Sequence, residues 1–252
     1  MLGAIIGDIA GSRFEFANTS DYNFEMFHKD CCFTDDTICT VAIADAILSG
    51  KSYKDSLVEW CNRYPHPMGG YGARFAEWIH DPVPYGSWGN GAAMRVSPVG
   101  WLFDDEKDVE RQAIETAKVS HNHPNGQKGA KAIAMAIFYL RMFNGKKTKF
   151  SILKKHVCHW NQDDIPPKGE WCDNCHGCVP LAFNLLLQSD SFNDAIRKAV
   201  SYGGDSDTIG AIVGSLAEAY YGIPADFKEK ALSYLPDDMK EVIKKFYEEV
   251  NK

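Results

Sequence analysis

Apolar residues recur along this chain at intervals of three and four, and this helical period restricts the possible folds more than any other feature. Residues 209–220 and 239–250 each place a stripe of apolar side chains on one helical face. Alternation with a period of two, which is typical of β-strands, is nearly absent. The pattern therefore predicts an all-α fold.

Further helices are expected from shorter or more uniform patterns. Residues 38–48 and 130–142 are apolar almost all round, which indicates central, buried helices. Residues 109–117, 181–187 and 195–200 carry the helical pattern over a shorter length.

Two stretches interrupt the helical pattern. Residues 64–98 are rich in Gly, Pro and aromatic residues, and residues 161–177 contain Pro166, Pro167 and several Gly and Cys. We expect both to be long ordered loops, which in compact domains often carry function. No repeat or charged linker divides the chain, so we expect a single compact multi-helix domain over residues 1–252.

Charge and cysteine content narrow the class of protein. The net charge of −7 argues against a nucleic-acid-binding surface, because phosphate binding requires an excess of Lys and Arg. Residues 1–8 lack the basic region of a signal peptide, and no stretch approaches the roughly 20 apolar residues of a membrane-spanning helix. The eight cysteines are irregularly spaced, which favours reduced thiols. We expect a cytoplasmic protein without a membrane partner.

Three glycines near the N-terminus would share one face of a helix. Gly3, Gly7 and Gly11 are spaced by four, and each costs a helix about 1 kcal/mol relative to Ala. We expect another backbone to approach this face closely. Asp8 and Glu15 are two turns apart and would also share a face. Taken alone, they are most simply solvated acids on a tightly packed helix.

Two acidic motifs precede two of the expected helices. Residues 34–37 (Thr-Asp-Asp-Thr) come before residues 38–48, and residues 203–208 (Gly-Gly-Asp-Ser-Asp-Thr) come before residues 209–220. Either motif alone is most simply a helix N-cap. Capping does not need two aspartates at each helix, however, and four carboxylates at one edge of a core would repel one another without a cation. Mg²⁺ prefers such oxygen ligands, and two ions about 3.5–4 Å apart form a known hydrolytic site.

Two polar segments could contact a ligand. Residues 85–95 (Tyr-Gly-Ser-Trp-Gly-Asn-Gly-Ala-Ala-Met-Arg) could bring backbone amides close to a phosphate, and Tyr85 or Trp88 could stack on a base. Residues 120–124 (Ser-His-Asn-His-Pro) are open to three interpretations: a polar loop, a zinc-binding His pair or an imidazole that contacts a ligand.

A cluster of cysteines leaves a zinc site open as the weaker alternative. Cys172, Cys175 and Cys178 are closely spaced, with Cys158 upstream. Structural zinc usually takes two separated pairs of ligands. Ordinary reduced thiols are therefore favoured.

Five segments, in order, resemble the ADP-ribosylglycohydrolase family, which includes hydrolases of ADP-ribosyl-arginine and ADP-ribosyl-serine. The resemblance implies an all-helical fold with two Mg²⁺ ions in a cleft. It also implies hydrolysis of the glycosidic bond between ADP-ribose and a modified protein or small conjugate, with release of ADP-ribose. The segments are residues 7–15 (Gly-Asp-Ile-Ala-Gly-Ser-Arg-Phe-Glu), 34–37, 89–95, 120–124 and 203–208.

The resemblance also implies roles for individual residues. The catalytic residues would be Glu15, Asp36 and Asp205, with Glu15 positioning or activating the attacking water. Cys175 and Cys178 would occupy positions of the family pattern, which weakens the zinc alternative. The metal ligands would be Thr34, Asp35, Asp36, Asp205, Asp207 and Thr208. The substrate-binding residues would be Tyr85, Ser87, Trp88, Gly89, Asn90, Gly91 and His121, with the three residues at 89–91 cradling the diphosphate.

Two other functions remain open at this point. The chain could be a catalytically silent ADP-ribose-binding protein, or a two-metal phosphohydrolase that cuts the diphosphate. The sequence leaves the acceptor and its linkage open, and it admits nucleic acid only as a modified substrate.

Overall fold

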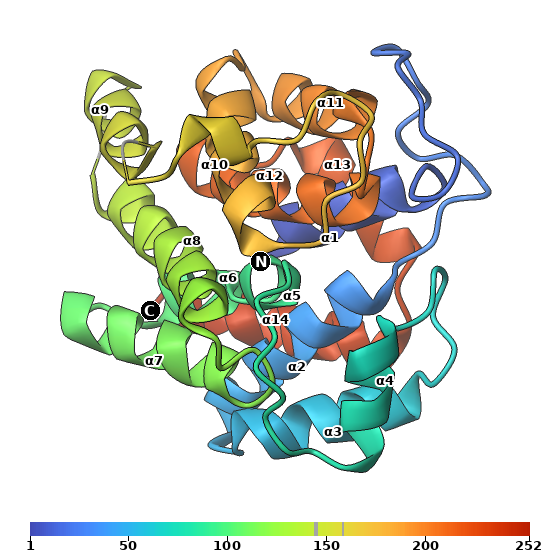
Figure 1. Cartoon of the computed structure of the whole chain (residues 1–252), viewed down its shortest axis with the longest axis vertical. Coiled ribbons are helices and arrows are strands. Elements are labelled where there is room, and N and C mark those ends of the chain that lie inside the picture. The colour runs from blue at the N-terminus through green and yellow to red at the C-terminus, as the bar shows by residue number, and fades with distance from the viewer. Residues whose placement is uncertain (144–145, 158) are drawn as a thin grey trace.

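The computed structural model describes residues 1–143, 146–157 and 159–252, and its regular secondary structure over these residues is helical, as predicted. Figure 1 shows α2, α3 and α4 towards one end of the molecule and α9 to α13 towards the other, with α1 and α5 between them. The helices of the described residues are α1 (Leu2–Ser12), α2 (Asp35–Ser49), α3 (Tyr53–Arg63), α4 (Ala73–His80), α5 (Gly91–Met94), α6 (Ser97–Leu102), α7 (Glu106–Lys118), α8 (Pro124–Met142), α9 (Lys146–Val157), the short 3₁₀ helix η1 (Gln162–Asp164), α10 (Cys175–Leu187), α11 (Phe192–Tyr202), α12 (Ser206–Tyr221), α13 (Ala225–Ser233) and α14 (Asp237–Val250).

The N-terminal glycines allow α1 and α12 to touch along their backbones. A Cβ on Gly3 would lie 2.3 Å from the carbonyl oxygen of Gly214, and a Cβ on Gly7 would lie 1.9 Å from that of Gly210. Gly11 lies in the same way against the first turn of α12. The expected close approach is confirmed, and it brings the start of α12 beside the C-terminal half of α1.

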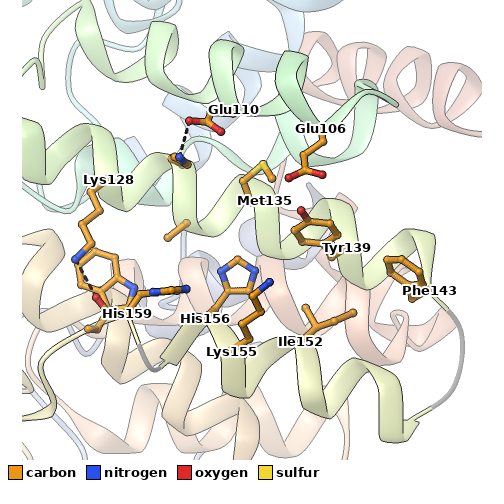
Figure 2. Close-up of a pocket in the computed structure, with 13 residues that line it drawn as sticks. Glu106, Glu110, Lys128, Met135, Tyr139, Phe143, Ile152, Lys155, His156 and His159 are labelled. Carbon is orange, nitrogen blue, oxygen red and sulfur yellow. Dashed lines mark hydrogen bonds and ion pairs between the residues drawn. The ribbon is translucent and has the colours of Figure 1, made fainter.

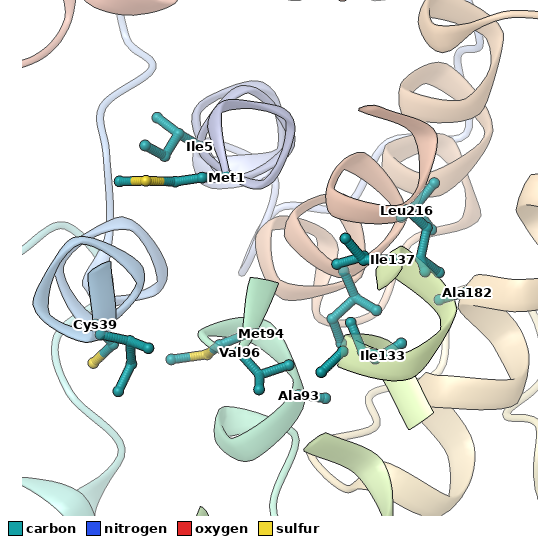
Figure 3. Close-up of a cluster of buried hydrophobic side chains, with 14 of the residues drawn as sticks. Met1, Ile5, Cys39, Ala93, Met94, Val96, Ile133, Ile137, Ala182 and Leu216 are labelled. Carbon is teal, nitrogen blue, oxygen red and sulfur yellow. The ribbon is translucent and has the colours of Figure 1, made fainter. Parts of the chain in front are cut away.

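The core collects side chains from helices that are far apart in sequence. Figure 3 shows members of one buried cluster from α1, α2, α8, α10 and α12, among them Ile5, Cys39, Ile137, Ala182 and Leu216. α2 and α8 are central and mostly buried, as their uniform hydrophobicity predicted. No helix in the described part of the chain is long and apolar enough to cross a membrane.

The prediction of a long loop is wrong in part for one of the two stretches. Residues 64–98 contain α4, α5 and the start of α6. α4 forms because Phe75, Trp78 and Ile79 lie on one helical face and are buried together. The helix has only eight residues, and Gly72 and Pro82 on either side obscured it. Residues 161–177, by contrast, hold only η1 and the first turn of α10.

Candidate active site

Asp8 is a buried carboxylate that fixes the start of α2. It accepts hydrogen bonds from the backbone amides of Thr34 (3.0 Å) and Thr37 (3.1 Å), and from both threonine hydroxyl groups. Burial raises the pKa of Asp8 to about 6, although these hydrogen bonds oppose the shift. The interpretation of Asp8 as a solvated acid is therefore wrong: it is a fully buried anchor between α1 and α2.

The two acidic motifs meet where α2 and α12 begin. The Thr208 hydroxyl donates a hydrogen bond of 3.1 Å to Oδ2 of Asp36. The side-chain amide of Asn90 donates one of 2.6 Å to Oδ2 of Asp205. Residues 34–37, 90 and 203–208 thus form one cluster, because the glycine contacts of α1 bring α12 towards α2.

Within this cluster, two buried oxygens have no protein donor. Oδ1 of Asp36 and Oδ1 of Asp207 are inaccessible to solvent and lack a hydrogen-bond partner. Burial, followed by the charges of neighbouring aspartates, raises the pKa values of both residues well above their usual range. Burial also raises the pKa values of Asp35 and Asp205. No Lys or Arg of the described chain forms an ion pair with any of these four.

Unpartnered carboxylate oxygens beside hydroxyl groups fit a hard divalent cation, which takes oxygen ligands. Among the described residues, no three His, Cys, Asp or Glu side chains already converge on one point as a metal site. Side-chain rotation would therefore have to accompany binding. The hydroxyl group of Thr208 lies against the Asp36 carboxylate, whereas that of Thr34 accepts from the Asp36 backbone amide and donates to Asp8.

Glu15 reaches the cluster from a turn and not from a helix. α1 ends at Ser12, so the expectation that Asp8 and Glu15 share a helical face is wrong. The side chain of Asn18 holds the turn: it donates to the carbonyl oxygens of Glu15 (3.2 Å) and Gly204 (2.9 Å) and accepts from the amide of Gly204. Burial, followed by the charges of Asp205 and Asp8, raises the pKa of Glu15 to about 7.

A cavity of about 430 Å³ opens above this cluster. Most of the predicted site residues line it, whereas Thr34 does not and is fully buried. The predicted residues that line it are Glu15, Asp35, Asp36, Tyr85, Ser87, Gly89, Asn90, Gly91, His121, Asp205, Asp207 and Thr208.

His121 and the glycine-rich segment form one wall of the cavity. A Cβ on Gly91 would lie 2.9 Å from Nε2 of His121, so only glycine fits against the ring there. The Ser120 hydroxyl lies 2.8 Å from Nδ1 of the same ring. Burial and the nearby Arg95 guanidinium hold the pKa of His121 well below its usual value, so its imidazole is neutral.

Trp88 does not line this cavity. Its ring is exposed and lies 6.1 Å from that of His123 and 5.9 Å from that of His176. Tyr85 is the aromatic residue of this segment that lines the cavity, where the Arg74 guanidinium lies 4.7 Å above its ring.

The lining residues that were not predicted from the sequence include Phe16, Arg74, Trp171 and Asp173. Arg74 donates a hydrogen bond of 2.7 Å to the carbonyl oxygen of Tyr85. Phe16 and Trp171 stack on each other, with ring centroids 5.8 Å apart. They come from the loop after α1, from the start of α4 and from the loop before α10, and they carry no periodic pattern. In the sequence, these residues were indicated only by the expectation that residues 64–98 and 161–177 form long loops of the kind that often carry function.

Cys172, Cys175 and Cys178 are free thiols that contact the backbone near this wall. The thiol of Cys175 donates to the carbonyl oxygen of Gly89, and that of Cys178 donates to the carbonyl oxygen of Cys172. Cys158 lies outside the described residues. These hydrogen bonds hold residues 172–178 beside the glycine-rich segment.

A second cavity of about 750 Å³ lies between α7, α8 and α9 (Figure 2). It is larger, but its acidic residues Glu106 and Glu110 do not form a cluster of unpartnered carboxylates. Lys131 forms an ion pair with Glu110 at 2.5 Å. The smaller cavity above the acidic cluster therefore remains the candidate active site.

Comparisons with known proteins show which sequences and structures this chain resembles. The family model of ADP-ribosylglycohydrolases matches residues 1–252. ADP-ribosyl-dinitrogen reductase glycohydrolase of Rhodospirillum rubrum is 25% identical over 88% of this chain and 84% of its own length. ADP-ribosylhydrolase ARH3 of Homo sapiens is 22% identical over 95% of this chain and 90% of its own. A solved structure named ADP-ribosylglycohydrolase-related protein complex has a TM-score of 0.76 at 21% identity, over 99% of this chain and 95% of that one.

Proposed function

This chain belongs to the ADP-ribosylglycohydrolase family, and on that basis we propose that it is a Mg²⁺-dependent hydrolase that releases ADP-ribose from a modified protein or small conjugate. One observation carries the proposal beyond family membership. The Thr208–Asp36 hydrogen bond joins the two acidic motifs at the floor of a cavity, where buried carboxylate oxygens remain without a donor.

The residues that would hold two Mg²⁺ ions are those of the two acidic motifs. Asp36 and Asp207 each offer an unpartnered oxygen, and Asp35 and Asp205 lie beside them. Thr34 and Thr208 add hydroxyl oxygens. When bound, such ions lower the pKa of water and orient it for attack.

Glu15 is suited to the proton transfer of this reaction. Its carboxyl group lines the cavity beside the two acidic motifs, where it can accept a proton and later donate it. In the proposed hydrolysis, water attacks the anomeric carbon of the distal ribose and the bond from that carbon to the acceptor breaks. Glu15 takes a proton from the water and returns one to the acceptor as it leaves. Asp36 and Asp205 stabilise the positive charge that develops on the sugar, as carboxylates do in glycoside cleavage.

The glycine-rich wall beside the carboxylates suits the diphosphate of the substrate. Gly89, Asn90 and Gly91 present backbone without bulky side chains, and Arg74 provides a positive charge in the same cavity. The neutral imidazole of His121 can donate one hydrogen bond towards a phosphate without adding charge.

Product analysis tests the proposal and separates it from the two other functions. Purified protein is incubated with an ADP-ribosylated protein or peptide, with Mg²⁺ and with EDTA, and the products are separated by chromatography. We expect free ADP-ribose in the presence of Mg²⁺ only. Release of AMP would show a phosphohydrolase, and binding of ADP-ribose without any product would show a silent binding protein.

A further inference from the structure

The cavity between α7, α8 and α9 has the size of a small-molecule site. Its volume of about 750 Å³ lies within the range of roughly 300–1,000 Å³ that is typical of ligand pockets. None of the residues that line it also lines the candidate active site. The proposed hydrolysis therefore does not use this cavity, and a ligand bound there would be a different molecule from the substrate.

The α8 side of this cavity is apolar along its length. Ala132, Met135 and Tyr139 recur at i, i+3 and i+7, so they form a stripe on one face of the helix over about 10 Å. Ile152 of α9 lines the cavity across from this α8 stripe, and Phe143 lies at its end (Figure 2). Phe143 remains 48% exposed, so an apolar ligand could remove more of this surface from water. An elongated apolar surface of this kind suits a linear hydrocarbon chain.

Basic groups gather beside the α8 stripe. Lys155, His156 and His159 all line the cavity. Burial, followed by the charges of His159 and Lys155, lowers the pKa of His156 to about 4, in keeping with their positions in Figure 2. The ring of His156 lies 6.2 Å from that of Tyr139. The basic groups are therefore close to one another and adjoin the apolar surface.

The carboxylates of this cavity have other partners. Glu110 forms an ion pair with Lys131, and Glu106 forms a hydrogen bond with the Tyr139 hydroxyl. Lys155 forms no ion pair with an acidic residue of the described chain. A negatively charged group on a ligand would thus find an unpaired cation at this point.

We propose that this cavity binds an amphipathic carboxylate, a linear acyl chain that ends in a carboxylate group, as in a medium-chain fatty acid. The carboxylate would lie against Lys155 and His159. The chain would lie along the α8 stripe and against Ile152, where its burial supplies most of the binding free energy. This site is independent of the proposed hydrolysis.

Calorimetric titration of the whole chain with four probes tests this site. Octanoate carries both the chain and the carboxylate. Acetate lacks the chain, octanol lacks the charge, and octylammonium reverses the charge. Melting temperatures show whether each variant is folded.

The variants separate the two parts of the site. Lys155→Gln removes the cation, Lys155→Arg keeps it, and Ile152→Ala shortens the apolar surface. Lys154→Gln and Phe150→Ala are the matched controls, because both residues are exposed on α9 and neither lines the cavity.

We expect one octanoate to bind per chain, octanol to bind at least tenfold more weakly, and acetate and octylammonium to show no binding. Lys155→Gln should weaken octanoate about fivefold and leave octanol unchanged. Ile152→Ala should weaken octanoate and octanol alike, by about fivefold. Lys155→Arg and the two controls should bind octanoate as the wild type does.

A wild type that does not bind octanoate, or that binds octylammonium equally well, would overturn the proposal. Normal octanoate binding by both Lys155→Gln and Ile152→Ala would also overturn it, because the ligand would then lie elsewhere. None of these measurements involves hydrolysis, so a failure here would leave the proposed function standing.

Discussion

Asp8 and Asp207 are both buried aspartates, yet their surroundings suit them to different tasks. Asp8 receives hydrogen bonds from two backbone amides and two hydroxyl groups. Oδ1 of Asp207 receives none from the described protein. Burial of a carboxylate without hydrogen-bond donors lowers the stability of the folded protein. We therefore interpret Asp8 as a structural anchor and Asp207 as a residue that requires a ligand.

Glu15→Gln should retain the fold and lose at least tenfold in turnover, which corresponds to about 1.4 kcal/mol of transition-state stabilisation. The amide keeps the shape of the side chain but cannot take a proton from water. Steady-state hydrolysis with Mg²⁺ measures the loss. Glu25→Gln, an exposed glutamate in the same loop, is the matched control and should be fully active. A Glu15→Gln enzyme with nearly normal turnover would remove Glu15 from the mechanism.

His156 should make the protein less stable in acid. Its ring stacks on Phe183, and burial, followed by the charges of His159 and Lys155, lowers its pKa to about 4. The unfolded chain therefore takes up the proton first, at about pH 6.5. The stability due to neutral His156 is present above that pH and is lost as the pH falls towards 4.

Urea unfolding between pH 7 and pH 4 measures this effect. Over that range, the free energy of unfolding of His156→Phe should fall by about 1–2 kcal/mol less than that of the wild type. His66→Phe, at an exposed histidine, should follow the wild type. If the unfolding free energies of His156→Phe and the wild type changed in parallel with pH, His156 would not be the source of the acid sensitivity.

At the scale of elements, the contact between α1 and α12 positions the active site. All residues of α1 are buried. Gly3 and Gly7 face glycines of α12, and Gly11 faces Ser206 and Asp207. This contact sets the distance between Asp8 on α1 and the start of α12. Side chains at these positions would separate the helices and, with them, the two acidic motifs.

Gly7→Ala should therefore destabilise the protein by about 3 kcal/mol or more, because its Cβ would lie 1.9 Å from the carbonyl oxygen of Gly210 and the helices must move apart. Gly72→Ala is the control. Nothing lies within 4 Å of a Cβ on Gly72, so its unfolding free energy should stay within about 0.5 kcal/mol of the wild type. Denaturant titration compares the two. A Gly7→Ala protein as stable as the wild type would show that the helices do not touch there.

The sequence predicted the helices that bury a long apolar face and missed those that do not. All seven predicted stretches lie in helices, including residues 38–48 in α2 and 239–250 in α14. α3 and α13 were missed because few of their residues are buried; in α13 only Ala231 is. Their helical structure depends on neighbours that no local pattern reveals.

The same limit applies to the candidate site. The acidic motifs were recognisable because each is local and precedes an apolar helix. The Thr208–Asp36 contact was expected only as a consequence of one shared core edge. The pairing of Phe16 with Trp171 joins two loops far apart in sequence, and no periodicity predicts such a contact.

At the scale of the whole molecule, one all-helical domain brings its acidic motifs to the floor of a single cavity. Two unit charges about 4 Å apart repel by about 4 kcal/mol at an effective dielectric constant of 20. The carboxylates of Asp35, Asp36, Asp205 and Asp207 should therefore strain the protein in the absence of a divalent cation. A ligand at a hundred times its dissociation constant adds about 2.7 kcal/mol of stability.

The most direct test is the melting temperature of the wild type and of Asp207→Asn, each in EDTA and in Mg²⁺. Asp105→Asn is the matched control, because Asp105 is a helix cap that accepts from the amides of Lys107 and Asp108, and Asn caps as well as Asp. We predict that Mg²⁺ raises the melting temperature of the wild type and of Asp105→Asn. Asp207→Asn should be more stable than the wild type in EDTA, respond weakly to Mg²⁺ and release no ADP-ribose. A wild type that melts at the same temperature in EDTA and in Mg²⁺, or an active Asp207→Asn enzyme, would contradict the account.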